Sequence, residues 1–150
     1  MQPDQAARPL WVCPKCGARL AGRNMNHACG DFTVEAFLSG KGTDALALWD
    51  ALVEAVESCG DFLFAPAKTR VAFMVRVRFL AVTSVSDRGL TFHLWLRDRV
   101  DSPRFFRIDD LGPGAVVHWV RLTASDQLDG ELRDLICAAY RVGASETRGR

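Results

Sequence analysis

Hydrophobic residues alternate strictly from Val71 to Ala81, and this pattern constrains the fold more than any other feature of the sequence. A period of two places every second side chain on the same face, so we expect a half-buried β-strand that is long enough to bend. The alternation returns from Leu90 to Leu96, after a predicted turn at residues 86–89. Segments joined by such a short turn are expected to pair as antiparallel neighbours.

Two further strands and two helices complete the expected pattern. The strands are predicted at residues 104–109 and 115–122. A helix with an apolar stripe that includes Leu46 begins near Asp44, and Ser125 is the predicted N-cap of a second helix. This order predicts an α+β fold, a two-layer sandwich in which an N-terminal and a C-terminal helix cover one face of a meander antiparallel sheet.

A small arm precedes this sandwich and carries three of the five cysteines in the stretch CPKCGARLAGRNMNHACG. Cys13 and Cys16 form a C-x-x-C knuckle closed by a glycine, and His27 and Cys29 follow as an H-x-C pair closed by another glycine. Either a disulfide framework or a metal site would account for such a cluster. Thiolates and imidazole are ligands that zinc prefers, and four of them complete its tetrahedral shell. The spacing therefore predicts one structural zinc ion as the cofactor.

The composition is that of an ordinary globular domain, with 150 residues, 49% hydrophobic residues and a formal net charge of +1. No secretory signal is visible, and the longest apolar runs are too short to span a bilayer. We therefore expect a cytoplasmic protein with reduced thiols and no membrane partner. Cys59 and Cys137, outside the cluster, are expected to be small core residues.

The chain is predicted to divide into five parts. These are a mobile N-terminus (1–10), a zinc-ribbon-like arm (11–30), a connector (31–43), the α+β sandwich domain (44–142) and a mobile tail (143–150).

Basic and aromatic residues are interleaved along the predicted strands. Between residues 68 and 107 the chain has nine Lys or Arg residues but only three Asp residues. Arginine and lysine bind phosphates and aromatic rings stack on bases, so an open sheet face of this kind suits nucleic acid. A solvated face whose arginines pair with nearby acids is the simpler interpretation. The candidate nucleic-acid-binding residues are Lys68, Arg76, Arg78, Trp95, Arg97, Arg104 and Arg107.

Other residues suggest a different class of function. An acidic stripe runs along the first predicted helix and consists of Asp50, Glu54, Glu57 and Asp61. It could bind cations, or it is only the solvent-exposed face of an amphipathic helix. His118 and Arg121 are candidates for a small-ligand pocket, although a hydrogen-bonded core histidine is the more ordinary role for His118. No Ser-His-Asp spacing, phosphate-binding loop or catalytic carboxylate pair is seen, so the sequence favours a non-enzymatic role.

The order of several segments resembles domain-of-unknown-function family 5655, in versions preceded by a zinc-ribbon-like segment. The segments are WVCPKCG, NHACG, PAKTRVAFMVRVRF, VVHWVRL and ASDQLDGELRDLICAAYRVG. The resemblance implies an architecture, and a nucleic-acid context by association with restriction-type endonuclease modules. The helix–sheet–helix order is also similar to the frataxin-like sandwich. The leading hypothesis is a zinc-binding adaptor whose sheet face engages nucleic acid. The alternatives are a cation-handling or small-ligand-binding protein, and a protein-interaction module whose partner is another protein.

Overall fold

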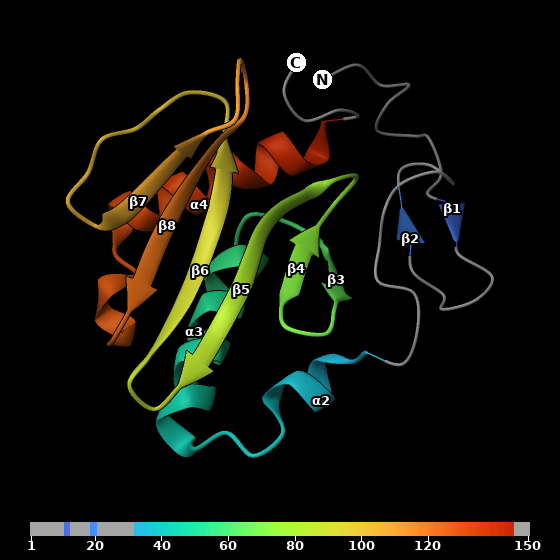
Figure 1. Ribbon diagram of the computed structural model, residues 1–150, viewed down its shortest axis with the longest axis vertical. Helices are drawn as coiled ribbons and strands as arrows, with labels where there is room; N and C mark the ends of the chain where they lie inside the picture. Colours follow the sequence, from blue (N-terminus) through green and yellow to red (C-terminus); the bar gives the residue numbers. More distant parts are fainter. Residues whose placement is uncertain (1–10, 13–18, 21–31, 146–150) are drawn as a thin grey trace.

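The computed structural model describes residues 11–12, 19–20 and 32–145. Its main element is a six-stranded antiparallel sheet with the strand order β3-β4-β5-β6-β8-β7. Two long helices, α3 and α4, lie together behind this sheet in Figure 1, so the predicted two-layer α+β sandwich is confirmed. The helices are α2 (Val34–Leu38), α3 (Thr43–Glu57) and α4 (Gly130–Ala144), and the main-sheet strands are β3 (Leu63–Pro66), β4 (Val71–Met74), β5 (Arg78–Ser86), β6 (Gly89–Leu96), β7 (Phe105–Asp110) and β8 (Val116–Leu122).

The sheet follows the predicted meander from β3 to β6 and then departs from it. The chain leaves β6 through residues 97–104 and forms β7 at the edge, and β8 then returns to lie between β6 and β7. The strand β3 was not predicted from the sequence. A separate pair of short strands, β1 (Trp11–Val12) and β2 (Arg19–Leu20), is antiparallel.

The long strand predicted from Val71 is interrupted at residues 75–77. The backbone N–H groups of Arg76 and Val77 both donate to the carbonyl oxygen of Gly143 in α4, at 2.9 and 3.0 Å. A register shift beside Met74 accompanies this bend. The sequence alternation gives no sign of this break, because the hydrogen bonds that fix the bend come from α4, which is distant in the sequence.

Each long helix begins at a cap, although not always at the predicted residue. Asp87, in the turn between β5 and β6, accepts a hydrogen bond from the N–H of Ala45 at 3.0 Å and so caps α3 from a distant part of the chain. Ser125 opens only a short 3₁₀ turn, and Asp129 is the N-cap of α4. The predicted apolar stripe of α3 is correct except for Leu46, which is 36% exposed.

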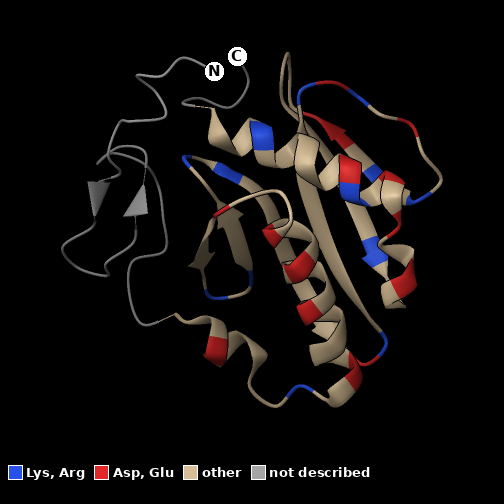
Figure 2. Ribbon diagram, turned by 180° about the vertical axis from the view of Figure 1, so that it is seen from behind, with Lys and Arg blue, Asp and Glu red and all other residues tan. Residues whose placement is uncertain are grey.

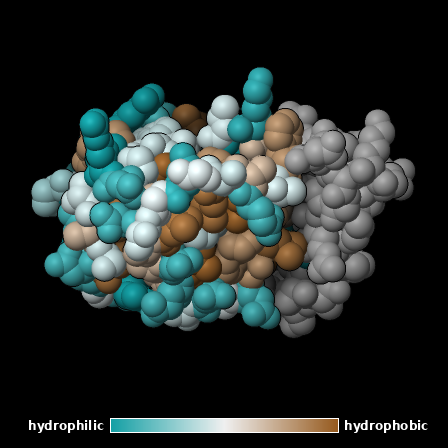
Figure 3. Space-filling view, turned by 90° about the horizontal axis from the view of Figure 1, so that it is seen from below, coloured by the Kyte–Doolittle hydropathy of each residue, from teal (hydrophilic) through white to brown (hydrophobic). Residues whose placement is uncertain are grey.

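The predicted connector contains the short helix α2, which packs against the core. Phe37 lies with its ring centroid 6.2 Å from that of Trp49, and Val34 and Leu38 also contact the core. Seen from below, hydrophobic residues gather at the centre of this end of the molecule (Figure 3). None of the helices in the described part of the chain has the length and apolar character needed to cross a membrane.

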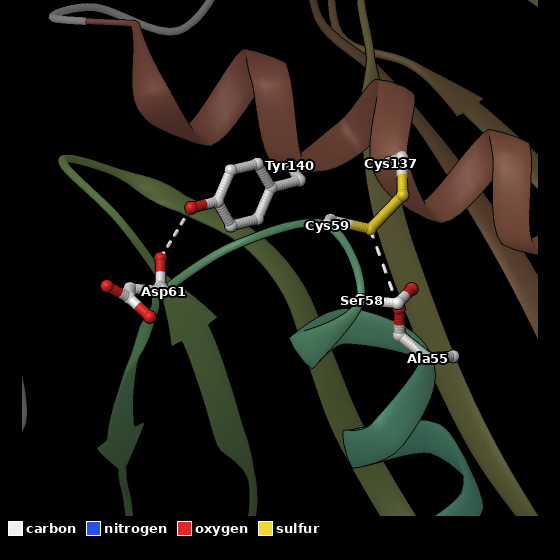
Figure 4. Close-up of a disulfide and its surroundings, with 6 residues drawn as sticks. All are labelled: Ala55, Ser58, Cys59, Asp61, Cys137 and Tyr140. Atoms are coloured by element: carbon white, nitrogen blue, oxygen red, sulfur yellow. Dashed lines mark hydrogen bonds between the residues drawn. A yellow bond between two sulfur atoms is a disulfide. The ribbon is translucent and has the colours of Figure 1, made fainter.

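Cys59 and Cys137 form a disulfide, so the prediction that they are separate core residues with reduced thiols is wrong. Cys59 follows the end of α3, Cys137 lies within α4, and both residues are half-buried. One turn further along α4, Tyr140 donates a hydrogen bond to the backbone oxygen of Asp61 (Figure 4). The disulfide and this hydrogen bond therefore tie the chain that leaves α3 to α4 at two neighbouring points.

Candidate nucleic-acid interface

Four aromatic rings form a continuous row on the sheet face that is opposite α3 and α4. The neighbours of His93 and Trp119 along their strands, such as Leu94 and Val120, belong to the core beneath the helices, so His93 and Trp119 point the other way. His93 is buried, with only 4% exposed, and its ring lies 4.8 Å from that of Trp95 and 4.3 Å from that of Trp119.

The row continues to the sheet edge at Phe106, whose ring is 6.3 Å from that of Trp119. We call His93, Trp95, Phe106 and Trp119 the aromatic row. No helix of the described chain lies over this face in Figure 1. Phe106 is 60% exposed, so the outer end of the row is open to a ligand.

A hydrogen-bond network fixes the orientation of Trp119. Asp109 accepts hydrogen bonds from the indole N–H of Trp119 at 3.1 Å and from Arg107 at 3.0 Å. These two bonds lower the pKa of the Asp109 carboxyl group, and the bond from Arg107 has the larger effect. The carboxyl group therefore stays ionised at neutral pH. The Arg107 guanidinium lies 5.5 Å from the Trp119 ring centroid. The outer part of the row thus combines an exposed ring, an oriented indole and an exposed cation.

The structure disperses the other predicted nucleic-acid-binding residues. Arg76 is only 6% exposed, beside the C-terminal end of α4. Arg78 is half-buried, and burial, with a smaller contribution from the charge of Arg70, lowers its pKa. Arg97 donates a hydrogen bond to Ser145 at 2.8 Å, and exposed Lys68 lies between β3 and β4.

Arg104 is engaged with acidic residues at the start of α4. Its guanidinium contacts Asp129 at 3.0 Å and Glu131 at 3.1 Å, and these carboxylates raise its pKa, the hydrogen bond that Arg104 donates to Asp129 contributing most. Of the seven predicted residues, Trp95 belongs to the aromatic row and Arg107 lies beside it. The sequence prediction missed Trp119. It directly follows His118 in β8, and because successive side chains of a strand face opposite sides, the sequence could have placed it on the face away from the core.

The predicted pocket of His118 and Arg121 is not brought together, because the two residues lie on opposite faces of β8. Arg121 lies on the open face and donates to the hydroxyl of Thr91 at 3.3 Å. His118 is fully buried; its Nε2 accepts from the N–H of Val100 at 3.0 Å and its Nδ1 donates to the oxygen of Val116 at 3.1 Å. The ring is therefore neutral, and burial lowers its pKa.

Asp50, Glu54 and Glu57 of the predicted acidic stripe lie on α3, where Figure 2 shows a series of acidic residues, whereas Asp61 lies beyond the end of this helix. Asp50, Glu54, Glu57 and Asp61 are all exposed. Within residues 32–145, no group of three or more His, Cys, Asp or Glu side chains is arranged to hold a metal ion. The predicted zinc ligands Cys13, Cys16, His27 and Cys29 lie outside the described residues.

The fold defines a small α+β domain in which helices cover one side of an antiparallel sheet and the aromatic row lies on the other. Residues 34–143 match the model of a family described as Domain of unknown function (DUF5655), and the chain belongs to this family. The match begins after the predicted zinc arm. No curated protein and no solved structure matches the chain.

Proposed function

We propose that this protein binds single-stranded nucleic acid on the sheet face opposite α3 and α4, at the exposed outer end of the aromatic row. The observation that carries the proposal is the outer end of the aromatic row, where exposed Phe106 and half-buried Trp119 lie together beside Arg107. Every base has a flat π-face, so unpaired bases stack on such rings with little dependence on sequence. A duplex keeps its bases stacked inside and offers fewer free faces, so the site favours single strands.

Two exposed arginines on the same face would contact phosphates. Arg107 lies beside the ring of Trp119, and Arg121 follows Trp119 by two residues along β8. The ion pair between Arg107 and Asp109 is exposed, with 62% of the Arg107 side chain accessible, so exchanging that partner for a phosphate costs little. The interface we propose is therefore centred on Trp119 and is smaller than the set of residues predicted from the sequence.

Fluorescence anisotropy with labelled 15-nucleotide single strands and the matching duplex tests this function. Removing the ring of Phe106 (Phe106→Ala) should weaken single-strand binding about tenfold, because stacking contributes about 1–3 kcal/mol per base. Leu111→Ala removes an apolar side chain of similar exposure, 64%, from outside the row and should bind like the parent. Equal binding by Phe106→Ala and the parent, or no binding of any strand at low salt, would refute the proposal.

We also propose that the arm holds one zinc ion through Cys13, Cys16, His27 and Cys29. The disulfide uses two of the five cysteines, and the remaining three all belong to this cluster. The strands β1 and β2 pair as an antiparallel ladder on either side of residues 13–18, with Val12 opposite Arg19. A short hairpin around a C-x-x-C knuckle is a suitable support for structural zinc, which would fold the arm when bound.

Metal analysis of protein purified without chelator tests the arm. The parent should contain one zinc ion per chain, and Cys13→Ser should lose it. Cys59→Ala/Cys137→Ala, which removes the two cysteines outside the cluster, should keep the metal. A parent without stoichiometric zinc would show that the cluster has another role.

A further inference from the structure

One edge of the main sheet is open for pairing. The strand β7 is last in the sheet order and, among the described elements, pairs only with β8. The outer backbone N–H and C=O groups of an edge strand can pair with another extended chain. The opposite edge is less suited to this, because β3 has four residues and ends at Pro66, which has no N–H to donate. β7 has six residues and no proline.

A hollow of about 520 Å³ adjoins β7. The loop residues Arg99, Asp101, Ser102 and Pro103 form one side, and Phe105–Ile108 of β7 form the other. The edge strand therefore forms one wall of a groove.

The loop that forms the other wall is anchored at several points, so the groove exists before any ligand binds. The N–H of Val100 donates to His118 at 3.0 Å, and the hydroxyl of Ser102 donates to Glu131 at 3.3 Å. Arg104, at the end of the loop, contacts Glu131 and Asp129 in ion pairs. A preformed groove reduces the entropy that a ligand loses on binding.

Two exposed arginines at the groove can bind an acidic ligand. Its lining contains two arginines, Arg99 and Arg107, and one acidic residue, Asp101. Both arginines pair with carboxylates two residues away, and 58% and 62% of their side chains are exposed. Such exposed pairs are weak, so a carboxylate of the ligand can replace the present partner.

We propose that the groove beside β7 binds an extended, acidic segment of a partner protein, which adds to the sheet as a seventh strand. Side chains of paired strands alternate between the two faces in step. An acidic side chain of the ligand would then lie beside Arg107 on the open face, and its neighbour would face the side of Ile108 and the loop. The ligand is accordingly a strand in which acidic and apolar residues alternate. Such binding obtains affinity from main-chain hydrogen bonds and specificity from the alternating side chains.

Capped hexapeptides that alternate Glu with Val, and the matching Lys–Val peptides, are the probes, titrated into the full-length protein and followed by amide NMR. The Glu–Val peptide should shift the amide resonances of residues 105–110. Two further peptides carry N-methyl groups on the odd-numbered or on the even-numbered nitrogens. One of the two should bind at least tenfold more weakly, because only every second N–H faces β7 and donates to it. Arg107→Glu should transfer the preference to the Lys–Val peptide, whereas Arg88→Glu, at the distant β5–β6 turn, should not.

Several results would overturn the proposal. They are binding that is insensitive to N-methylation in both registers, resonance shifts confined to other parts of the protein, and no binding of either peptide to a folded parent. Concentration-dependent dimerisation that shifts the same amides would identify a second copy of the chain as the occupant instead. The peptide and nucleic-acid assays are separate, so failure of one proposal leaves the other testable.

Discussion

Removing the disulfide between Cys59 and Cys137 should substantially lower the free energy of unfolding. The bond joins residues separated by 78 positions in the sequence. A cross-link that closes a loop of this length reduces the entropy of the unfolded chain, and the chain-entropy estimate is about 4.5 kcal/mol. That is a large part of the roughly 5–15 kcal/mol that stabilises a typical domain.

The folded state should change little when the bond is lost. Tyr140 still donates its hydrogen bond to Asp61 one turn further along α4, and its ring packs against that of Phe79 at 5.4 Å between centroids. The loss should therefore appear as a lower denaturation midpoint, while the circular dichroism spectrum of the folded protein stays the same.

Guanidinium unfolding of the parent and of Cys59→Ala/Cys137→Ala, each with and without dithiothreitol, measures this effect. The reductant should lower the midpoint of the parent to near that of the variant, and it should change the midpoint of the variant far less. Because the variant retains the cysteines of the arm, any effect of the reductant on the arm appears in both proteins and cancels. Unfolding free energies of the oxidised parent and the variant that agree within about 1 kcal/mol would refute the reasoning.

Three further changes test the packing and the caps. The pKa of His118 is lowered in the folded protein, so the unfolded chain binds a proton first as the pH falls below about 6.5. The free energy of unfolding should then fall by up to about 1.4 kcal/mol per pH unit until the folded-state pKa is reached. In chemical denaturation, His118→Phe should reduce this slope. Asp87→Ala removes the cap of α3 and should cost about 1 kcal/mol, measured by thermal melting against the exposed control Arg88→Ala. Gly143→Ala places a methyl group 2.5 Å from the Phe79 ring, and overpacking of about 1–3 kcal/mol should exceed the helix-propensity gain of about 1 kcal/mol; a variant more stable than the parent would contradict this geometry.

Local patterns in the sequence predicted most of the elements because helices and strands have fixed periods. The steps of three and four around Trp49 predicted α3, and the alternation from Leu90 to Leu96 predicted β6. The short elements α2 and β3 were missed, because five and four residues do not display a period. They depend instead on contacts with the core, such as that between Phe37 and Trp49.

The candidate interface was predicted only in outline. The sequence indicated that basic and aromatic residues share the strands, and Trp95 and Arg107 do lie on or beside the aromatic row. It did not show that Arg76 is buried against α4 or that Arg104 is paired with Asp129, because both partners lie far away in the sequence.

The sequence by itself therefore determined the local structure: the period of the long elements, the inward face of β6 from Leu90 to Leu96, and the cluster of zinc-type ligands in the arm. It did not show that β4 is buried on both faces. Only the tertiary structure decided which distant groups meet. It placed Cys59 against Cys137, bent the chain at Arg76 toward α4, and inserted β8 between β6 and β7, which brings Trp119 beside His93. Residues that recur at a fixed spacing reveal their own element, whereas contacts between elements depend on how their buried faces pack, and no local period in the sequence records that packing.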